Sequence, residues 1–331
     1  MNYGHLNSVG FFYIFASMKR TIIFLATSVL LLSSASVLYA DRPKGANLTV
    51  GTYNIRYQNT KDNIAGNGWE ERIPWIISLV EFVGPDILVT QEATPSQRTD
   101  LIEGLAGYSC IGVGRNDGEN GPKSGEHSLV FYRTDRFKLL DHGDFWLSET
   151  PDVPSKGWDA ALPRICTWGC LRDRVTHKRI WIFNLHNDHR GVQARLESSK
   201  LVVKKVKEMT VPKDVVFITG DYNLDQNSEV YNIYAEHFQD SYETALYRYA
   251  PNGTFNAWQT AALTESRIDH IFVNFGIEIL NYGVLTETYR SPVADEGGLQ
   301  RSANFPSEIG YRETVARLPS DHFPVFIKVK L

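Results

Sequence analysis

Short runs of apolar residues, separated by polar segments, occupy most of the chain after residue 40. The runs are rich in β-branched residues and end in polar side chains, which is typical of strands. They predict strands at residues 48–55, 86–90, 128–132, 180–185, 215–219, 268–273 and 324–329.

Two other segments have apolar residues at helical spacing. Segment 69–83 repeats isoleucine and valine at intervals of three and four residues, and Gly84-Pro85 ends it. Segment 195–209 follows the same pattern. Strands with interspersed helices predict layered sheets flanked by helices, in one domain from about residue 47 to residue 331.

Two stretches between these elements are predicted to be loops. Residues 112–125 are rich in glycine and charge, and residues 290–320 carry several prolines and glycines. A loop as long as the second is usually functional or disordered. Because it ends directly at Asp321 and His322, we expect it to form a rim or lid.

The first 40 residues differ from the rest. Lys19 and Arg20 precede an apolar run, small residues follow up to Ala40, and the segment has no acidic residue. This pattern predicts a secretory signal peptide over residues 1–40, with Met18 as a candidate true start. The chain 41–331 is then an exported catalytic domain, periplasmic or extracellular. The alternative is an uncleaved anchor over 21–40, which is just long enough to span and contact a membrane.

Composition and charge narrow the class of protein. The 331 residues are 43% hydrophobic, enough for a sizeable core. Lys and Arg number 34 against 38 Asp and Glu, a net charge of −4. Removing residues 1–40 takes away two cations, giving −4 − 2 = −6. Proteins that clamp long duplex DNA are usually basic, so this balance disfavours nucleic acid without excluding a small phosphate ester.

The three cysteines do not suggest a disulfide framework. If Cys166 and Cys170 share a strand, their Cα atoms lie about 13 Å apart. A disulfide needs Cα atoms within about 7 Å, so we expect this pair to be unbridged.

The candidate chemistry lies where the apolar runs stop. Taken singly, each polar residue there is explained as a turn, a cap or a satisfied histidine. Together, carboxylates and amides are oxygen ligands suited to Mg²⁺ or Mn²⁺, and two histidines can act as acid, base or phosphate-oxygen donors. With no serine elbow and no glycine-rich phosphate loop, the set indicates metal-assisted hydrolysis by water. Its members are Asn54, Glu92, His186, Asp221, Asn223, Asp269, Asp321 and His322.

The order of these residues along the chain resembles the endonuclease/exonuclease/phosphatase superfamily over residues 48–331. That superfamily includes pancreatic-type deoxyribonucleases, AP endonucleases, bacterial sphingomyelinases, inositol polyphosphate 5-phosphatases and deadenylases. Segments 145–148 and 163–168 further resemble a secreted bacterial subgroup. The motifs that carry the likeness are TYNIR at 52–56, QE at 91–92, NLH at 184–186, GDYN at 220–223, RIDH at 267–270 and SDHFP at 320–324.

The resemblance implies a fold and a metal centre. The expected fold is a four-layer α/β/β/α sandwich of two packed mixed, mainly antiparallel sheets, with the site at one end. By position, Glu92 is the principal metal ligand, Asn54 lies beside it, and Asp321 lies near the metal. The implied ion is Mg²⁺ or Mn²⁺.

The resemblance also implies the catalytic roles. Asp221 orients or activates the attacking water, and Asn223 donates to a phosphate oxygen. His322 is the general base or transition-state stabiliser, oriented by Asp269. His186 donates to the phosphate or protonates the leaving group.

Three further residues have two interpretations each. Asp188 and His189 follow His186 and are candidates for substrate contact, but Asp188 alternatively only supports its loop. Arg164 is a candidate phosphate-binding side chain and equally a candidate for a buried ion pair.

The prediction that results is an exported, divalent-metal-dependent phosphoesterase, which hydrolyses a phosphodiester or phosphomonoester by in-line attack of activated water. A secreted nuclease would use Trp146, Trp158 and Trp168 to stack bases. A sphingomyelinase-like phospholipid phosphodiesterase would need an exposed apolar tip. A sugar- or inositol-phosphate phosphatase fits the charge best. The rival class is a non-catalytic binding module on the same fold.

Overall fold

The computed structural model describes residues 46–293, 300–301 and 310–331. The predicted signal peptide or anchor within residues 1–40 lies outside these ranges and stays a prediction. Within them, each helix is too short or too polar to cross a membrane.

One sheet has seven strands in the order β10-β12-β17-β1-β2-β4-β3. The central strand β1 pairs in parallel with β2 and antiparallel with β17. The strands are β1 (Asn47–Asn54), β2 (Ile87–Ala93), β3 (Tyr108–Ile111), β4 (His127–Arg133), β10 (Tyr247–Tyr249), β12 (Glu278–Val284) and β17 (Val325–Lys330).

The second sheet has six strands in the order β5-β6-β7-β8-β11-β9. Here β7 and β8 are parallel, and the other pairs are antiparallel. The strands are β5 (Phe137–Trp146), β6 (Ile165–Asp173), β7 (Arg179–His186), β8 (Val215–Asp221), β9 (Gln239–Asp240) and β11 (Asp269–Val273). Cys166 and Cys170 both lie on β6 and are free, as expected.

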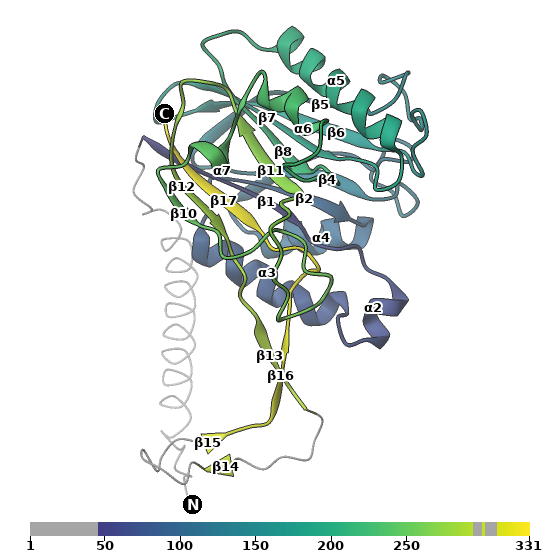
Figure 1. Ribbon diagram of the computed structural model, residues 1–331, viewed down its shortest axis with the longest axis vertical. Coiled ribbons are helices and arrows are strands. Elements are labelled where there is room, and N and C mark those ends of the chain that lie inside the picture. The colour runs from purple at the N-terminus through teal and green to yellow at the C-terminus, as the bar shows by residue number, and fades with distance from the viewer. Residues whose placement is uncertain (1–45, 294–299, 302–309) are drawn as a thin grey trace, which may run out of the picture. The chain divides into compact units, whose positions relative to one another are not determined.

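Helices cover the outer face of each sheet, which confirms the predicted α/β/β/α layers (Figure 1). Helix α3 (Trp69–Val83) and helix α4 (Pro95–Gly104) pack on the seven-stranded sheet. Helices α5 (Val192–Met209) and α6 (Tyr231–Ala235) pack on the six-stranded sheet. The short helices α2 (Thr60–Ile64) and α7 (Ser241–Thr244) lie in connections.

The core between the sheets is apolar except near one end. Its members come from both sheets and include Val50, Val89, Ile182 and Phe217, all fully buried. Near this end, Gln91 Nε2 donates to the side-chain Oδ1 of Asn184 at 2.7 Å and so joins β2 to β7. This amide pair ties the two sheets together one residue before Glu92 and two before His186.

The predicted elements agree with these boundaries in most places. Each of the seven predicted strands is present, the first helix has the predicted ends, and α5 begins three residues earlier than the pattern indicated. The segment 290–320 contains the strand pair β13 (Tyr289–Pro292) and β16 (Thr314–Arg317), and the pair β14 (Gln300–Arg301) and β15 (Gly310–Tyr311). The prediction that this segment is a loop is therefore wrong for the part of it that the structure describes.

Candidate active site

Two parallel strand pairs, β1 with β2 and β7 with β8, bring the candidate residues to one end of the sandwich. Strands β1 and β2 end at Asn54 and Ala93, and β7 and β8 end at His186 and Asp221. In the register of the second sheet, Asp221 lies beside both His186 and Asp269. Because carboxyl ends of parallel strands share one edge, residues far apart in sequence meet here.

The carboxylate of Asp221 lies at the centre of the candidate site residues. Its Oδ2 accepts from Asn54 Nδ2 at 3.0 Å and lies 3.5 Å from His186 Nε2 and 3.8 Å from His322 Nε2. Its Oδ1 accepts from the backbone N–H of Asn223 at 2.9 Å. Burial, with the nearby charge of Asp269, raises the pKa of Asp221 to about 7.

His322 and Asp269 form a buried dyad behind this carboxylate. His322 Nδ1 donates to Asp269 Oδ2 at 2.9 Å, which leaves Nε2 facing Asp221. Burial opposes the charged imidazole, but the charge and hydrogen bond of Asp269 outweigh it and raise the pKa of His322 to about 10. The bond to Asp269 thus fixes the orientation of the His322 ring, with Nε2 toward Asp221.

Glu92 reaches the cluster through an irregularity in β2. Its φ is 66°, in the left-handed region, and the register with β4 shifts between Thr90 and Ala93. A bulge of this kind redirects a side chain out of the ordinary alternation. The carboxylate then accepts from Asn54 Nδ2 at 3.0 Å and from the Tyr57 backbone N–H at 3.0 Å.

These donors fit a hard divalent cation. Ligand atoms of Glu92, His186 and Asp221 lie within 4.8 Å of one another, as do those of Asp221, Asp269 and His322. Carboxylate oxygens with one imidazole suit Mg²⁺ or Mn²⁺. Asn54 acts here as a tie, because its nitrogen faces the two carboxylates and its Oδ1 accepts from the Arg56 N–H at 3.0 Å.

The cluster forms one end of a cavity of about 480 Å³. Asp321 lies in its wall and pairs with Arg56 at 3.2 Å, which leaves it outside both groups of three ligand atoms found among the described residues. Asn223 also lines the cavity, and its Nδ2 donates to the Asn187 carbonyl at 2.9 Å. The predicted roles of Asp321 at the metal and of Asn223 at the phosphate stay predictions.

Arg164, Asp188 and His189 form a group of hydrogen-bonded side chains beside the cavity. Arg164 Nε donates to Asp188 Oδ2 at 3.2 Å, and its Nη2 donates to His189 Nδ1 at 3.0 Å. Arg164 and His189 border the cavity. Asp188 is buried and accepts backbone N–H groups of Arg190 and Gly191 at 2.9 and 2.8 Å, so it supports the loop after β7.

Asp188→Asn is expected to destabilise the protein by about 1–3 kcal/mol at neutral pH, because an amide accepts these N–H groups less strongly than a carboxylate. Burial opposes ionisation, but the backbone donors and Arg164 lower the pKa of Asp188. The lowered pKa of Asp188 stabilises the fold fully above the unfolded value of about 4, and this stabilisation is lost progressively as the pH falls from there through the lower pKa of the folded state. Urea unfolding between pH 3 and 7 measures this. If the free energy of unfolding of the variant falls with decreasing pH as steeply as that of the wild type, the role assigned to Asp188 is wrong.

The pattern of strand ends did not reveal two residues in the cavity wall. Arg115 and Glu126 form a bidentate pair, with both Nη–Oε distances at 2.8 Å, at the two ends of the predicted loop 112–125. The charge-rich, glycine-rich composition of that loop was the available signal. Of the tryptophans considered for base stacking, Trp146 is buried and donates to the Arg115 carbonyl at 2.7 Å, and none borders the cavity.

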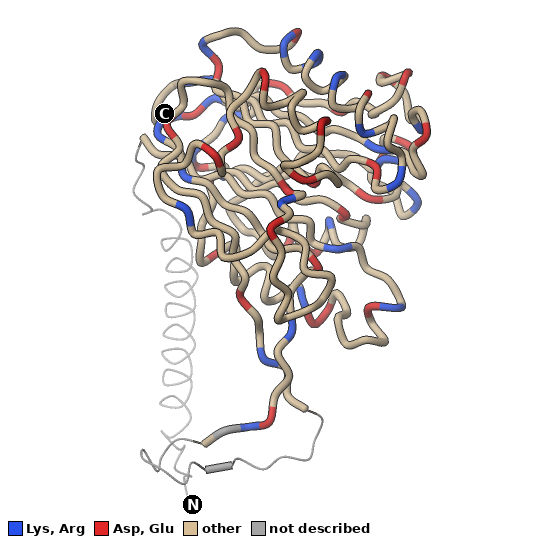
Figure 2. Tube along the Cα trace, viewed as in Figure 1, with Lys and Arg blue, Asp and Glu red and all other residues tan. Residues whose placement is uncertain are grey.

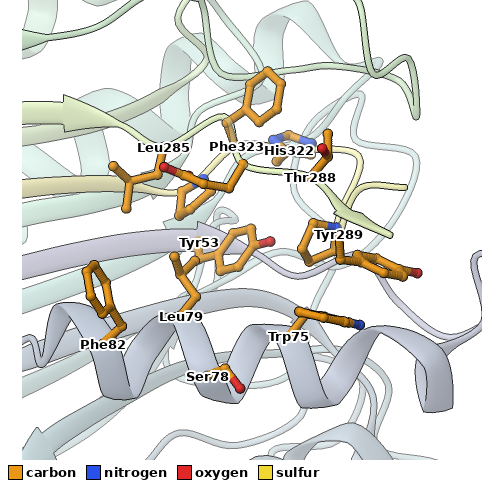
Figure 3. A pocket seen from close by; sticks show the side chains of 13 residues that line it. Tyr53, Trp75, Ser78, Leu79, Phe82, Leu285, Thr288, Tyr289, His322 and Phe323 are labelled. Carbon is orange, nitrogen blue, oxygen red and sulfur yellow. The ribbon is translucent and has the colours of Figure 1, made fainter. Parts of the chain in front are cut away.

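A second hollow, of about 260 Å³ and lined mostly by apolar side chains, also borders His322 (Figure 3). Trp75 of α3 stacks on Tyr289 there, with ring centroids 5.0 Å apart. His322 borders both hollows. Residues 294–299 and 302–309 of the predicted lid lie outside the described residues, and the described part of the lid reaches this apolar hollow through Pro319 rather than the catalytic cavity.

The fold and the site together define a class, the phosphoesterases built on a two-sheet sandwich. The sequence profile of the Endonuclease/Exonuclease/phosphatase family matches residues 51–322, and the chain belongs to this family. Family members are hydrolases that act on phosphate esters and generally use a divalent metal.

Three solved structures show how far the likeness extends. A family protein from Bacteroides thetaiotaomicron is 46% identical, with a TM-score of 0.78, and the match covers 86% of this chain and 97% of that one. A mannosyl-6-phosphatase from the same species is 47% identical, with a TM-score of 0.77, covering 86% and 100%. The catalytic domain of human Nocturnin, 17% identical with a TM-score of 0.60 over 86% and 93%, shows the fold alone.

Among curated proteins, an uncharacterized protein of Acanthamoeba polyphaga mimivirus is 30% identical over 173 residues. The match covers 47% of this chain and 60% of the viral protein.

Proposed function

We propose that this protein is a divalent-metal-dependent phosphomonoesterase that removes phosphate from a sugar phosphate. The observation that carries the proposal is the cavity of about 480 Å³. Its lining contains His186, Asp221 and His322 of the candidate site together with three arginine side chains. A compact cavity with a few local cations suits a small anionic ester. The 47% identity to a mannosyl-6-phosphatase, over that protein's whole length, supports the same substrate class.

In this proposal, Glu92 and Asp221 hold Mg²⁺ or Mn²⁺, with Asn54 between the carboxylates and Asp321 nearby. The ion, when bound, supplies a Lewis acid beside the phosphate and lowers the pKa of water. These residues offer the donor types such an ion requires.

The remaining groups of the chain perform the in-line displacement. Asp221 orients the water that attacks phosphorus, and the ester P–O bond on the opposite side breaks. His322, held by Asp269 and protonated because its pKa is raised, stabilises through Nε2–H the charge that develops on phosphorus, and the water proton passes to Asp221. His186 donates to the phosphate or protonates the departing alcohol, and Asn223 donates to a phosphate oxygen.

A nuclease function has less support. Cationic and acidic positions are interspersed along the described chain in Figure 2, whereas a surface that tracks a nucleic-acid backbone needs a basic stripe. The net charge of −4 agrees with this. Aromatic stacking platforms are also needed for single strands, and the three candidate tryptophans lie outside the cavity wall.

The test is product release by residues 41–331 on a panel of hexose 6-phosphates, inositol phosphates, sphingomyelin, single-stranded DNA and duplex DNA. Each substrate is assayed with Mg²⁺ and with EDTA. We expect Mg²⁺-dependent phosphate release from a hexose phosphate at a kcat/KM at least tenfold above any diester. Preferential cleavage of DNA or sphingomyelin would contradict the proposal.

We also propose that residues 1–40 are a signal peptide and that the enzyme is exported. The charge and hydropathy pattern of that segment supports this. Expression of the full chain in a bacterium, followed by fractionation and N-terminal sequencing, is expected to give a periplasmic or secreted protein that begins near residue 41. An intact N-terminus in the membrane fraction would favour the anchor.

A further inference from the structure

We propose that Arg115 and Arg164 form a two-guanidinium subsite that recognises the doubly charged phosphate of a monoester and disfavours diesters. The inference rests on the proposed function and assigns its selectivity to two named side chains. Arg115 comes from the loop after β3, and Arg164 directly precedes β6.

Both guanidinium groups lie in the cavity wall next to Glu92 and His186. Each borders the catalytic cavity, and together with Glu92 and His186 they also line a small recess of about 10 Å³. The two arginines therefore converge on the same corner of the cavity from separate elements.

Both side chains are held in place before substrate arrives. The backbone N–H of Arg115 donates to the Glu126 carbonyl at 3.0 Å, and both of its Nη atoms donate to the Glu126 carboxylate at 2.8 Å. Arg164 is held by Asp188 and His189. A guanidinium immobilised in this way loses little further conformational entropy on binding an anion.

Each arginine keeps a donor with no partner. Arg115 Nε and Arg164 Nη1 are buried and make no hydrogen bond, although the side chains are only 10% and 4% exposed. Buried N–H groups in native proteins are normally paired, so unpaired ones beside a cavity indicate where a ligand oxygen belongs. Phosphate oxygens are well matched to the planar donors of arginine.

The ester class that fits is the monoester. Above its second pKa of about 6 a phosphomonoester carries two negative charges, whereas a diester carries one. A monoester also has three non-bridging oxygens, and in a diester one of these carries a carbon substituent. Two immobilised guanidinium groups are therefore expected to bind the monoester more tightly than the diester, because the monoester offers one more negative charge and one more acceptor oxygen.

The test compares p-nitrophenyl phosphate with bis(p-nitrophenyl) phosphate, which have the same leaving group, in the presence of Mg²⁺. The variants are Arg164→Met and the double variant Arg115→Gln/Glu126→Gln, which keeps a neutral amide pair. We expect each to lower the monoester-to-diester ratio of kcat/KM by about 10- to 100-fold, as for loss of hydrogen bonds to a charged group. The exposed neighbour variant Arg190→Met is the matched control and is expected to keep the wild-type ratio.

Inhibition supplies a second readout that does not depend on turnover of either ester. Inorganic phosphate is expected to inhibit the variants at least tenfold more weakly than the wild type, with inhibition by dimethyl phosphate unchanged. Melting temperatures establish that each variant is folded. If folded variants lose activity on both esters equally, the subsite is wrong and the proposed function stands. If the wild-type enzyme hydrolyses only the diester, both are wrong.

Discussion

Replacement of His322 by alanine is expected to lower kcat/KM for the phosphate ester by about 10²- to 10⁴-fold, the usual contribution of a positioned acid–base group. The physical reason is that Nε2 lies 3.8 Å from Asp221 Oδ2, inside the cavity, and is the only nitrogen of this ring left free by the bond to Asp269. Steady-state kinetics at saturating Mg²⁺ measure the effect. His322→Gln retains a donor toward Asp269 and serves as the variant with the least structural disturbance.

Asp269 provides the internal control for this prediction. Its carboxylate acts through His322, so Asp269→Asn is expected to lower kcat with little change in KM. The double variant Asp269→Asn/His322→Ala is expected to be no slower than His322→Ala alone, because groups that act as a unit are not additive. Losses that multiply in the double variant, or a kcat for His322→Ala within threefold of wild type, would contradict the dyad.

Glu92→Gln is expected to abolish most of the stabilisation that Mg²⁺ confers on the folded protein. An ion at 100 times its Kd stabilises the native state by about 2.7 kcal/mol, and the variant is expected to lose the greater part of that. Glu92 supplies a carboxylate to the ligand group with His186 and Asp221. Thermal unfolding with Mg²⁺ and with EDTA measures this without substrate, and kcat is expected to fall at least about 100-fold in parallel.

The matched control is Glu103→Gln, which alters an exposed glutamate on α4. It is expected to retain the wild-type response to Mg²⁺ in both unfolding and activity. An equal Mg²⁺-induced rise in melting temperature for Glu92→Gln and wild type would sink the assignment of Glu92 as a ligand.

Much of the fold was predictable because strands and helices are encoded locally. Isoleucine and valine at helical spacing, followed by Gly84-Pro85, set the ends of α3, and Gly84 adopts a left-handed φ of 61° at its C-terminus. The strands β5 and β12 were not predicted. In both strands, exposed and half-buried positions interrupt the buried ones, so they lack the continuous apolar run that marked the predicted strands.

The Arg115–Glu126 pair was missed for a different physical reason. Its two members are separated by a loop, and what joins them is a set of contacts with other elements, including the bond from Trp146 to the Arg115 carbonyl. A pattern along the chain carries no information about which charges face each other across a cavity. The ion pair predicted for Arg164 is present with Asp188, and Arg164 also borders the cavity, whereas phosphate binding by Arg164 stays a prediction.

By itself the sequence determined the layered class of fold, the order of the strands that carry the site, and the residues that gather at their ends. These features follow from local hydrophobic periodicity and from short motifs, and neither requires knowing which segments pack together. Only the tertiary structure decided how those residues face one another. The bulge that redirects Glu92, the orientation of the Asn54 amide and the placing of Arg115 beside Arg164 depend on packing between segments distant in sequence, and local propensity does not specify such contacts.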